Sequence, residues 1–387
     1  MADPVLSRIV WPDDAPRVCL VGGAVRDALL GVSHGPDIDL VVEGDAIALA
    51  AVVGHDLGGA VIGHARFGTA RVELAHGRHV DMVTARRESY AQPGALPDVE
   101  PGDLADDLAR RDFTVNAIAY VLHGDGEGGI IDPHDGRADI IAERIRTLRA
   151  GAFREDPSRV VRAIRYAARL GFRMEEDTEA EARESAPQTS LESSRVADEA
   201  ARLLAEGSAS VALAMADALG APWPDPDDRR DDRLAALVGA LSRPGAPAPS
   251  AWALRLGLGV RPEAAAGAAV PAWARALAAE VRAGLSRAPM LQGDAPPSRI
   301  DATLRDMPPA AQVGALVGGA DVVSRWWADW RDMAPEVTGA DLVAAGVPPG
   351  PAIGRALRAV RAALLDGHVD GRGEQMALAL AEAGSYR

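Results

Sequence analysis

Two short stretches near the start of the chain decide the fold: VCLVGGAVRD at residues 18–27 and DIDLVV at residues 37–42. Each contains an apolar run of the length expected for a buried strand. The first run ends at a diglycine, and the chain then continues into a helix that we expect to reach about Leu30. In the second stretch, strand alternation places Asp37 and Asp39 on one face and Ile38 on the other. The two stretches together predict a strand, a glycine turn, a helix and a second strand that carries paired carboxylates.

The glycine turn has the features of a phosphate-binding site. Gly22 and Gly23 let the backbone turn sharply and approach a ligand closely. The helix that follows offers unpaired amide donors and the positive end of its dipole. Arg26 lies one helical turn into that helix, and we expect its guanidinium to bind a triphosphate.

The paired carboxylates are typical of a magnesium site. Mg²⁺ prefers hard oxygen ligands, and two such ions activate an attacking hydroxyl while they stabilise a departing oxygen. Asp37 and Asp39 are therefore the predicted metal ligands and catalytic residues. Asp81, an acid inside the β-compatible run HVDMV at 79–83, is the candidate for a third catalytic carboxylate. Glu73 remains open as its rival.

The pattern of the chain changes near residue 137. Before it, β-like runs alternate with turns at 18–21, 37–42, 70–74, 79–83 and 117–121, which predicts a mixed α/β unit. Residues 86–109, rich in Pro and Gly, are predicted to form a long connection without strands. After residue 139 the periodicity is helical. We expect three parts: a mixed α/β unit at 1–137, a helical part at 138–207 and a further helical part at 208–387.

Composition limits the kind of protein. The chain has 387 residues and no lysine, so arginine side chains and backbone amides must make any phosphate contacts. The net charge of −15 predicts that a nucleic-acid site is local rather than spread over the surface. The only cysteine, Cys19, lies in an apolar run and is expected to be a buried hydrophobe. No apolar stretch reaches the length of a membrane span, so we expect a soluble cytoplasmic protein.

A third motif narrows the family. The glycine turn and paired aspartates resemble the nucleotidyltransferase superfamily of DNA polymerase β, and RRDFTVNAIA at 110–119 resembles the second motif of class II tRNA nucleotidyltransferases and bacterial poly(A) polymerases. The resemblance implies a polymerase β-like catalytic head, here residues 1–137. An all-helical remainder follows it, with a neck at 138–207 and a tRNA-binding body and tail at 208–387. It also implies that Arg111, Asp112 and Asn116 hold the ribose and phosphates of the incoming nucleotide. A carboxylate accepts hydrogen bonds from ribose hydroxyls, and Asn offers both a donor and an acceptor.

The neck carries a further motif of the same family. FREDPSRVVRAIRYAARLGF at 153–172 resembles the nucleotide-selecting motif, and the resemblance assigns base reading to Asp156 and Arg159. From Arg159 onward, Arg162 and Arg165 continue one stripe of the predicted helix. Between residues 137 and 173 there are ten arginines and four acids. We expect this stripe to bind the triphosphate and RNA.

The ordered motifs imply a tRNA nucleotidyltransferase that adds CCA to the 3′ end of tRNA from CTP and ATP, without a template, in a two-magnesium mechanism. Enzymes that add only CC or only A, and a poly(A) polymerase, share these motifs and remain alternatives. A non-catalytic RNA-binding protein on the same scaffold and a small-molecule nucleotidyltransferase are more remote. The segment at 338–354 resembles the C-terminal helical part of bacterial members, which holds the tRNA elbow. The sequence leaves the oligomeric state open.

Overall fold

The computed structural model describes residues 3–32, 37–89, 98–227, 230–243, 245–247 and 249–384. By contacts between residues the chain divides into two compact units. The first comprises Met1–Thr189 and Ala214–Pro222, and the second comprises Ser190–Leu213 and Trp223–Arg387. The predicted division at residue 137 therefore falls inside the first unit, and the three-part division stays a prediction.

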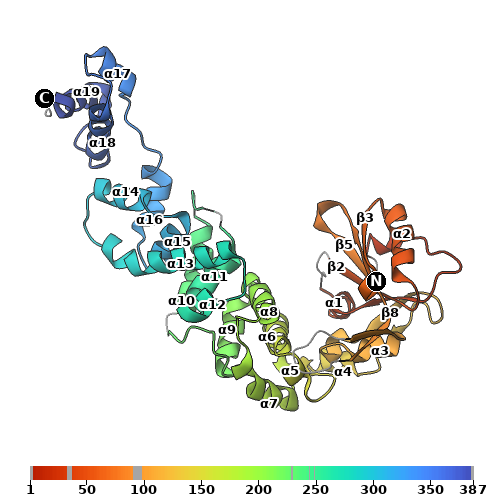
Figure 1. The fold of residues 1–387 in the computed structure, drawn as a ribbon. Helices are drawn as coiled ribbons and strands as arrows, with labels where there is room; N and C mark the ends of the chain where they lie inside the picture. Colours follow the sequence, from red (N-terminus) through yellow and green to blue (C-terminus); the bar gives the residue numbers. More distant parts are fainter. Residues whose placement is uncertain are drawn as a thin grey trace. The chain divides into compact units, whose positions relative to one another are not determined.

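A mixed sheet forms the centre of the first unit, as the sequence predicts (Figure 1). Within the described residues, the strands follow the order β3-β4-β5-β2-β1-β8-β9. β2 and β5 are parallel, and the other neighbours in the sheet are antiparallel. The strands are β1 (Val18–Val21), β2 (Asp37–Val42), β3 (Ala60–His64), β4 (Thr69–Glu73), β5 (His79–Thr84), β8 (Ala119–His123) and β9 (Ile130–Ile131).

Helices cover the two faces of this sheet unequally. Helix α2 (Ala46–Leu57) packs on β3, β4 and β5, and its Gly54 lies against the side chains of Val61 and Val72. Helix α3 (Leu104–Ala109) packs on the opposite face, where its leucines join Cys19, Val41 and other apolar residues in a buried cluster. Cys19 is 1% exposed, and burial raises the pKa of its thiol to about 11. The expectation of a buried cysteine is confirmed.

The prediction for residues 86–109 is wrong in part. Among the residues described there, β6 (Arg86–Ser89) and β7 (Asp98–Pro101) form an antiparallel hairpin, and α3 follows. Residues 90–97 lie outside the described residues. The strands were missed because RRES and DVEP lack the apolar run or alternation that marks the predicted strands, and the second ends at a proline. Helix α3 was missed because its start is marked by a capping box between Asp103 and Asp106 rather than by an apolar period.

The rest of the first unit is mainly helical. It contains a short parallel pair, β10 (Arg144–Ile145) and β11 (Arg173–Met174), which the helical pattern did not predict. The helices are α1 (Gly23–Leu29), α4 (Gly136–Ile141), α5 (Ala152–Glu155), α6 (Ser158–Leu170) and α7 (Glu176–Ser185). Single turns are η1 (Leu6–Arg8), η2 (Ala65–Phe67), η3 (Ala75–Gly77), η4 (Thr114–Asn116) and η5 (Ala186–Gln188).

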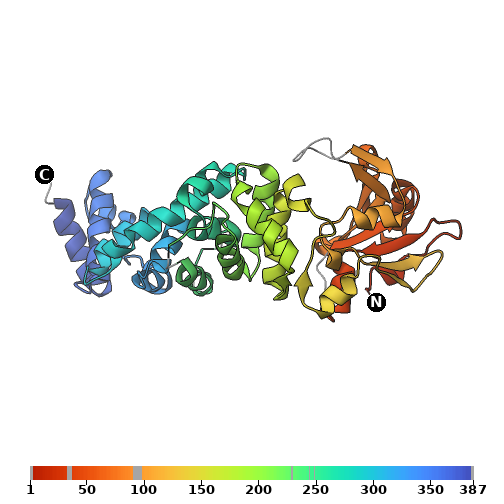
Figure 2. The ribbon, with the colours of Figure 1, turned by 90° about the horizontal axis from the view of Figure 1, so that it is seen from below.

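The second unit is helical throughout its described part, as the sequence predicts (green to blue in Figure 2). α13 packs on both α11 and α15. The division between the two units falls inside helix α9 (Ala209–Ala218), after Leu213. The other helices and turns are α8 (Ser194–Ala205), α10 (Arg230–Leu241), α11 (Ala251–Gly259), α12 (Pro262–Gly267), α13 (Ala272–Arg287), η6 (Ala288–Leu291), α14 (Pro297–Arg305), α15 (Pro309–Val317), α16 (Val322–Arg325), the π-turn η7 (Trp326–Trp330), α17 (Gly339–Ala344), α18 (Pro351–Leu365) and α19 (Gly371–Gly384).

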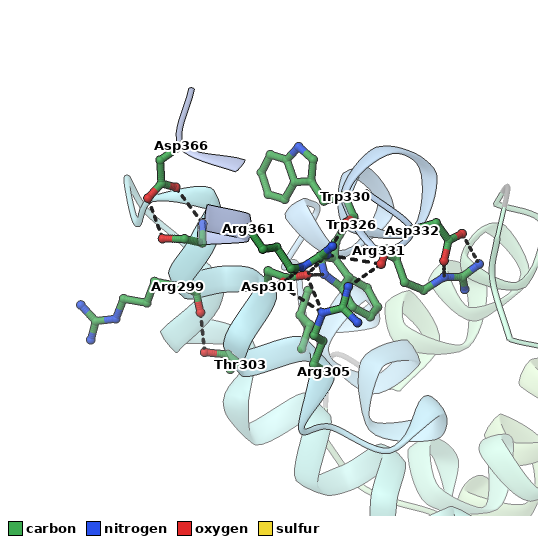
Figure 3. Close-up of polar contacts among 12 residues, drawn as sticks. Arg299, Asp301, Thr303, Arg305, Trp326, Trp330, Arg331, Asp332, Arg361 and Asp366 are labelled. Atoms are coloured by element: carbon green, nitrogen blue, oxygen red, sulfur yellow. Dashed lines mark hydrogen bonds and ion pairs between the residues drawn. The ribbon is translucent and has the colours of Figure 1, made fainter. Parts of the chain in front are cut away.

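A buried carboxylate joins three of these elements (Figure 3). Asp301 on α14 is 5% exposed and accepts hydrogen bonds from Trp326 Nε1 at 2.8 Å, from Arg305 Nε, and from Nε and Nη2 of Arg361 on α18. Burial alone would raise the pKa of Asp301, but the bonds from Arg361, Trp326 and Arg305 outweigh it and hold that pKa below its ordinary value. Asp301 is therefore ionised and ties α18 to α14.

Candidate active site

The paired carboxylates lie where the sequence places them. Asp37 and Asp39 occupy alternate positions of β2, both exposed, and Ile38 between them is buried. The side chain of Asp37 is 61% exposed. The prediction that the two carboxylates share one face of the sheet is confirmed.

The neighbouring strand decides which acid is closest to the pair. β5 runs parallel to β2, and its Asp81 is in register with Asp39. Glu73 on β4 is instead in register with His79, one row away. His79 Nε2 lies 3.2 Å from Asp37 Oδ1 and 3.4 Å from Asp81 Oδ2, so it bridges the two carboxylates. The geometry favours Asp81 over Glu73 as the third carboxylate.

Asp81 also has a cationic partner. Arg71 on β4 is in register with it and forms a two-point pair, with Nε to Oδ1 at 2.7 Å and Nη2 to Oδ2 at 2.8 Å. The sequence interpretation did not single out Arg71 or His79. Strand alternation within residues 69–73 and 79–84 is the signal that puts both on the carboxylate face.

Crowding of negative charge is evident at Asp39. The protein around its carboxylate displaces water and raises the pKa of Asp39, although the residue as a whole is exposed. The charges of Asp81 and Asp37 raise this pKa further, and the guanidinium of Arg111 opposes them. A cation bound between these carboxylates would relieve the repulsion.

The glycine turn contacts this site directly. Gly22 precedes α1 with φ of 73°, a conformation that side chains rarely adopt. A Cβ added at Gly22 would lie 3.1 Å from Arg111 Nη1 and 3.7 Å from Asp39 Oδ2. The turn, the guanidinium and the carboxylate therefore surround one point. A phosphate group at this point would meet the turn, a cation and the metal ligands.

The guanidinium of Arg111 is held by a buried carboxylate. Its Nη2 donates to Oδ2 of Asp107 at 2.9 Å, and Asp107 is fully buried and also binds Arg110. The Nε atom of Arg111 is buried without a hydrogen-bond partner. Arg111 is thus fixed by one carboxylate and retains a buried donor that a ligand can satisfy.

The ribose motif forms a buried network. Asn116 Nδ2 donates to Asp112 Oδ1 at 3.1 Å, and Arg162 Nε on α6 donates to Asp112 Oδ2 at 2.8 Å. Asp112 is 9% exposed and also accepts from the amide of Phe113. Burial would raise the pKa of Asp112, but Arg162, Asn116 and the amide hold it below its ordinary value. Asp112 is therefore a fixed carboxylate, which suits it to a ribose hydroxyl.

Arg26 makes its hydrogen bonds inside the unit. It is 1% exposed, and its guanidinium donates to Asp27 Oδ1 at 2.6 and 2.8 Å and to Asn116 Oδ1 at 2.6 Å. Arg26 therefore orients Asn116, and its binding of a triphosphate stays a prediction.

Four arginines surround one aromatic ring in this region. The guanidinium carbons of Arg26, Arg162, Arg165 and Arg169 lie 5.2, 5.7, 4.6 and 5.0 Å from the ring centre of Tyr166. Each is within the range of a cation–π contact. Tyr166 therefore gathers the predicted arginine stripe of α6 and joins it to Arg26 on α1. The sequence interpretation missed Tyr166, although it stands one residue after Arg165.

The base-reading pair begins helix α6. Asp156 is 5% exposed, and its Oδ1 accepts from the amide and hydroxyl of Ser158 at 3.1 and 2.6 Å. Arg159 is 7% exposed, and its Nη1 is buried without a hydrogen-bond partner. A buried cationic donor that lacks a partner is costly unless a ligand supplies one. Arg159 is thus suited to receive an acceptor such as a base carbonyl or ring nitrogen.

Among the described residues no group of three His, Cys, Asp or Glu side chains is arranged to enclose a metal ion. Mg²⁺ is commonly bound by one or two carboxylates together with water and substrate phosphates. Asp37 and Asp39 beside the glycine turn fit that mode, because the phosphates of a nucleotide would supply the remaining oxygens. Within the same residues, no helix is long and apolar enough to cross a membrane.

Known proteins match both the sheet and the full chain. Residues 18–146 match the model of the poly(A) polymerase head domain. A CC-adding tRNA nucleotidyltransferase of Deinococcus radiodurans is 35% identical over 365 residues, which cover 91% of this chain and 85% of that protein. The chain belongs to the class II tRNA nucleotidyltransferase family. The resemblance stated from the motifs is confirmed.

Other members of the family match more locally or by fold. An A-adding tRNA nucleotidyltransferase of Halalkalibacterium halodurans is 47% identical over 159 residues, 41% of this chain but only 37% of that relative's length. A solved structure of a CCA-adding enzyme in an apo form has a TM-score of 0.79 and 25% identity, and the match covers 94% of this chain and 91% of that one. The expected fold class, a mixed-sheet head followed by helices, is confirmed.

Proposed function

We propose that this nucleotidyltransferase adds C and A residues to the 3′ end of tRNA from CTP and ATP, without a nucleic-acid template. The observation that carries the proposal is the meeting of Asp39, Arg111 and the Gly22 turn at one point, with the ribose and base motifs beside it. The family relationship supports it, since CC-adding and A-adding tRNA nucleotidyltransferases are among the relatives. The substrates of this chain are inferred from those relatives.

The roles divide by the part of the nucleotide that each group would hold. Gly22, Gly23 and Arg111 would hold the triphosphate, while Asp112 and Asn116 would hold the ribose. Arg162 would hold the Asp112 carboxylate that contacts the ribose. Arg165, whose guanidinium carbon lies 4.6 Å from the Tyr166 ring centre, would add positive charge near the triphosphate. In the reaction the 3′-hydroxyl oxygen bonds to the α-phosphorus, the bond to the β-phosphate oxygen breaks, pyrophosphate leaves, and the hydroxyl proton passes to water.

Magnesium would bind at Asp37 and Asp39. When bound, the metal supplies positive charge that activates the hydroxyl and stabilises the leaving pyrophosphate. The chain's own contribution is to fix the carboxylates on β2 and to place Asp81 next to Asp39 in the same row. Asp81 then completes the carboxylate group of the catalytic site.

Base selection would rest on Asp156 and Arg159. The pairing edges of C and A both present an amino donor beside a ring-nitrogen acceptor, whereas U and G present the reverse order. A carboxylate acceptor next to a guanidinium donor matches C and A. The wrong base would leave a buried group unsatisfied, at a cost of roughly 1 to 3 kcal/mol.

One observation favours a second candidate, addition of CC alone. The Deinococcus radiodurans relative, which matches 91% of this chain, is a CC-adding enzyme. The A-adding relative matches over only 41% of this chain and 37% of its own length. Asp156 and Arg159 fit both bases, as full CCA addition requires, but enzymes of either specificity share this pair, so the assay below separates the two candidates.

A primer-extension assay separates these functions. Transcripts of tRNA that end before the first C, after C and after CC are incubated with Mg²⁺ and with CTP, ATP or both, and the products are sequenced. We expect CCA completion of all three transcripts. Growth that stops at CC would show the second candidate, and long A tails on unrelated RNA would overturn the tRNA-specific proposal.

A further inference from the structure

Strand β3 forms an open edge of the central sheet. It pairs with β4 along one side, from Ala60 opposite Glu73 to His64 opposite Thr69. All five of its residues are exposed, and among the described residues no strand pairs with its outer side. The outward amide and carbonyl groups of an edge strand are a template for another strand. β3 therefore offers hydrogen-bonding groups for strand addition.

β3 lacks the features that usually protect an edge strand. Its sequence, AVIGH, contains no proline and no Lys, Arg, Asp or Glu, and its register with β4 is continuous. The strand at the other edge, β9, has only two residues, which limits pairing there. Val61 and Ile62, 39% and 44% exposed, place apolar side chains on the two faces of the β3 edge. The edge is thus both unprotected and apolar.

The charge around β3 favours a second copy of this chain as its partner. Residues 57–72 contain no Asp or Glu, although the chain has 56 acidic residues and a net charge of −15. Two copies of so acidic a protein repel each other over most of their surface. Within residues 57–72 no carboxylates would face each other, so the copies can approach at this edge.

The length of β3 sets the register of such a pair. When a five-residue strand pairs fully with its own copy about a two-fold axis, the central Ile62 lies opposite Ile62 of the second copy. On the face covered by α2, Val61 of one copy then lies opposite Gly63 of the other. Gly63 has no side chain, and a Cβ added there would lie 3.3 Å from Cγ2 of Ile47 on α2. Val61 of the second copy can therefore pack over Gly63 and against Ile47.

The opposite face of the edge is self-complementary as well. There the two Ile62 side chains lie side by side, and Ala60 lies between Glu73 of its own copy and His64 of the other. The small side chain of Ala60 leaves space for the imidazole of His64 to contact the Glu73 carboxylate. Glu73 and His64 are both exposed, and the two-fold axis forms this contact twice.

We propose that β3 pairs antiparallel with β3 of a second copy, so that the protein is a two-fold dimer with one continuous sheet. Asp39, Asp81, Arg71 and Ile62 follow one another in register on neighbouring strands, so both carboxylate sites lie on the same face of this sheet. Seven strand intervals separate the two Asp39 residues, roughly 34 Å at about 4.8 Å each. Each site is then complete within its own copy, and the dimer does not depend on the proposed function.

Charge substitutions at the two-fold axis test this register in the full-length protein. In sedimentation-equilibrium measurements at micromolar concentration, the wild type should have twice the mass of the chain. Ile62→Lys and Ile62→Glu each place like charges directly opposite each other, and we expect each to raise the dissociation constant of the dimer at least tenfold. An equimolar mixture of the two variants should dimerise again, because opposite charges then meet across the axis.

Val52→Lys is the matched control. Val52 is 38% exposed on α2, two residues before Gly54, which faces Val61, so its side chain points away from β3. This variant should dimerise like the wild type. A monomeric wild type, an unchanged dimer in Ile62→Lys, or a mixture no more dimeric than its two components would overturn the proposal.

Thiol crosslinking locates the contact independently. Cys19, the only cysteine, is buried, so the thiol introduced by Ile62→Cys is the accessible one. A short bismaleimide should join two chains of Ile62→Cys into a covalent dimer and should leave Val52→Cys as single chains. Equal crosslinking of the two variants would refute pairing at β3.

Discussion

Removal of the Arg162 guanidinium tests how the ribose carboxylate is maintained. Arg162 Nε and Nη2 contact Asp112 Oδ2 at 2.8 and 2.7 Å, and the Asp112 side chain is 9% exposed. Arg162→Met keeps much of the side-chain volume but leaves this carboxylate with only the Asn116 amide and the Phe113 backbone amide as donors. The substitution therefore removes the positive charge next to Asp112 together with its contact to the Tyr166 ring.

The expected loss of stability is substantial. Removing one partner of a fully buried ion pair costs about 3 to 5 kcal/mol, because the other charge stays buried and uncompensated. The Arg162 side chain is 29% exposed, so water replaces part of the contact. We therefore expect the free energy of opening around Asp112 to fall by roughly 2 to 3 kcal/mol at pH 7.

The pH dependence gives the sharper test. In the wild type the folded-state pKa of Asp112 is lowered, so its contribution to stability is complete above the unfolded pKa and is lost as the pH falls through the folded pKa. Without Arg162, burial is the largest influence and raises the pKa of Asp112. The variant then loses stability as the pH rises from the unfolded pKa through the raised folded one. The difference in stability between the wild type and Arg162→Met must therefore increase from acidic to neutral pH.

Hydrogen exchange measured by mass spectrometry follows this gap segment by segment. Peptides covering residues 104–123 and 158–170 are compared between pH 5 and pH 8 in the wild type and Arg162→Met. Arg154→Met is the control, since Arg154 and its partner Glu184 are 68% and 64% exposed and their pair should contribute less than about 1 kcal/mol. A gap that is constant with pH, or no larger than in the control, would refute the assigned role of Arg162.

Three further outcomes follow from the structure. Asp39→Ala should abolish incorporation while the fold is retained, because it removes a metal ligand from an exposed position; retained turnover with unchanged circular dichroism would end the metal proposal. Tyr166→Leu should raise the KM for nucleotides about tenfold, whereas Tyr166→Phe should leave it unchanged. The reason is that the cation–π contacts, worth about 0.5 to 1 kcal/mol each, depend on the aromatic ring. Equal kinetics for both variants would contradict this role of the ring. Asp301→Ala should lower the free energy of unfolding of the second unit by about 3 to 5 kcal/mol, measured by urea titration with tryptophan fluorescence. The control is Asp332→Ala, because the Asp332 side chain is 82% exposed, and it should change this free energy by less than about 1 kcal/mol. Similar urea midpoints for the two variants would disprove the tie between α14 and α18.

The positions of the carboxylates could be predicted because they depend on local geometry. Strand alternation alone placed Asp37 and Asp39 on one face, and the bounds of β1 and β2 agree with the predicted runs. The same rule applied to two strands would have put Arg71 and Asp81 on a common face. It could not give their register, which depends on how β4 and β5 pair. Local periodicity therefore gives faces, and tertiary pairing decides which residues meet.

Two features of the structure depend on contacts that no local sequence pattern shows. Arg26 pairs with Asn116, ninety residues away, so no local pattern could show that its guanidinium is used inside the unit. The hairpin of β6 and β7 consists of four-residue strands that gain stability only by pairing with each other. In both cases a pairing contact, and not a periodic pattern within the segment, determines the structure.

The arrangement of the site suggests why this lysine-free family member uses so many arginines in one place. A cluster of point charges around one ring would repel, but planar guanidinium groups can contact the Tyr166 ring with their faces while their edges donate to carboxylates. Arg26 and Arg162 do both, since each lies over Tyr166 and each donates to an acidic side chain. The ring and the carboxylates thus hold the glycine-turn helix, the ribose motif and α6 as one network. Asp156 and Arg159 lie at the start of α6, so the network that fixes α6 also fixes the residues proposed to select the base. The base-selecting and ribose-binding groups are thereby connected.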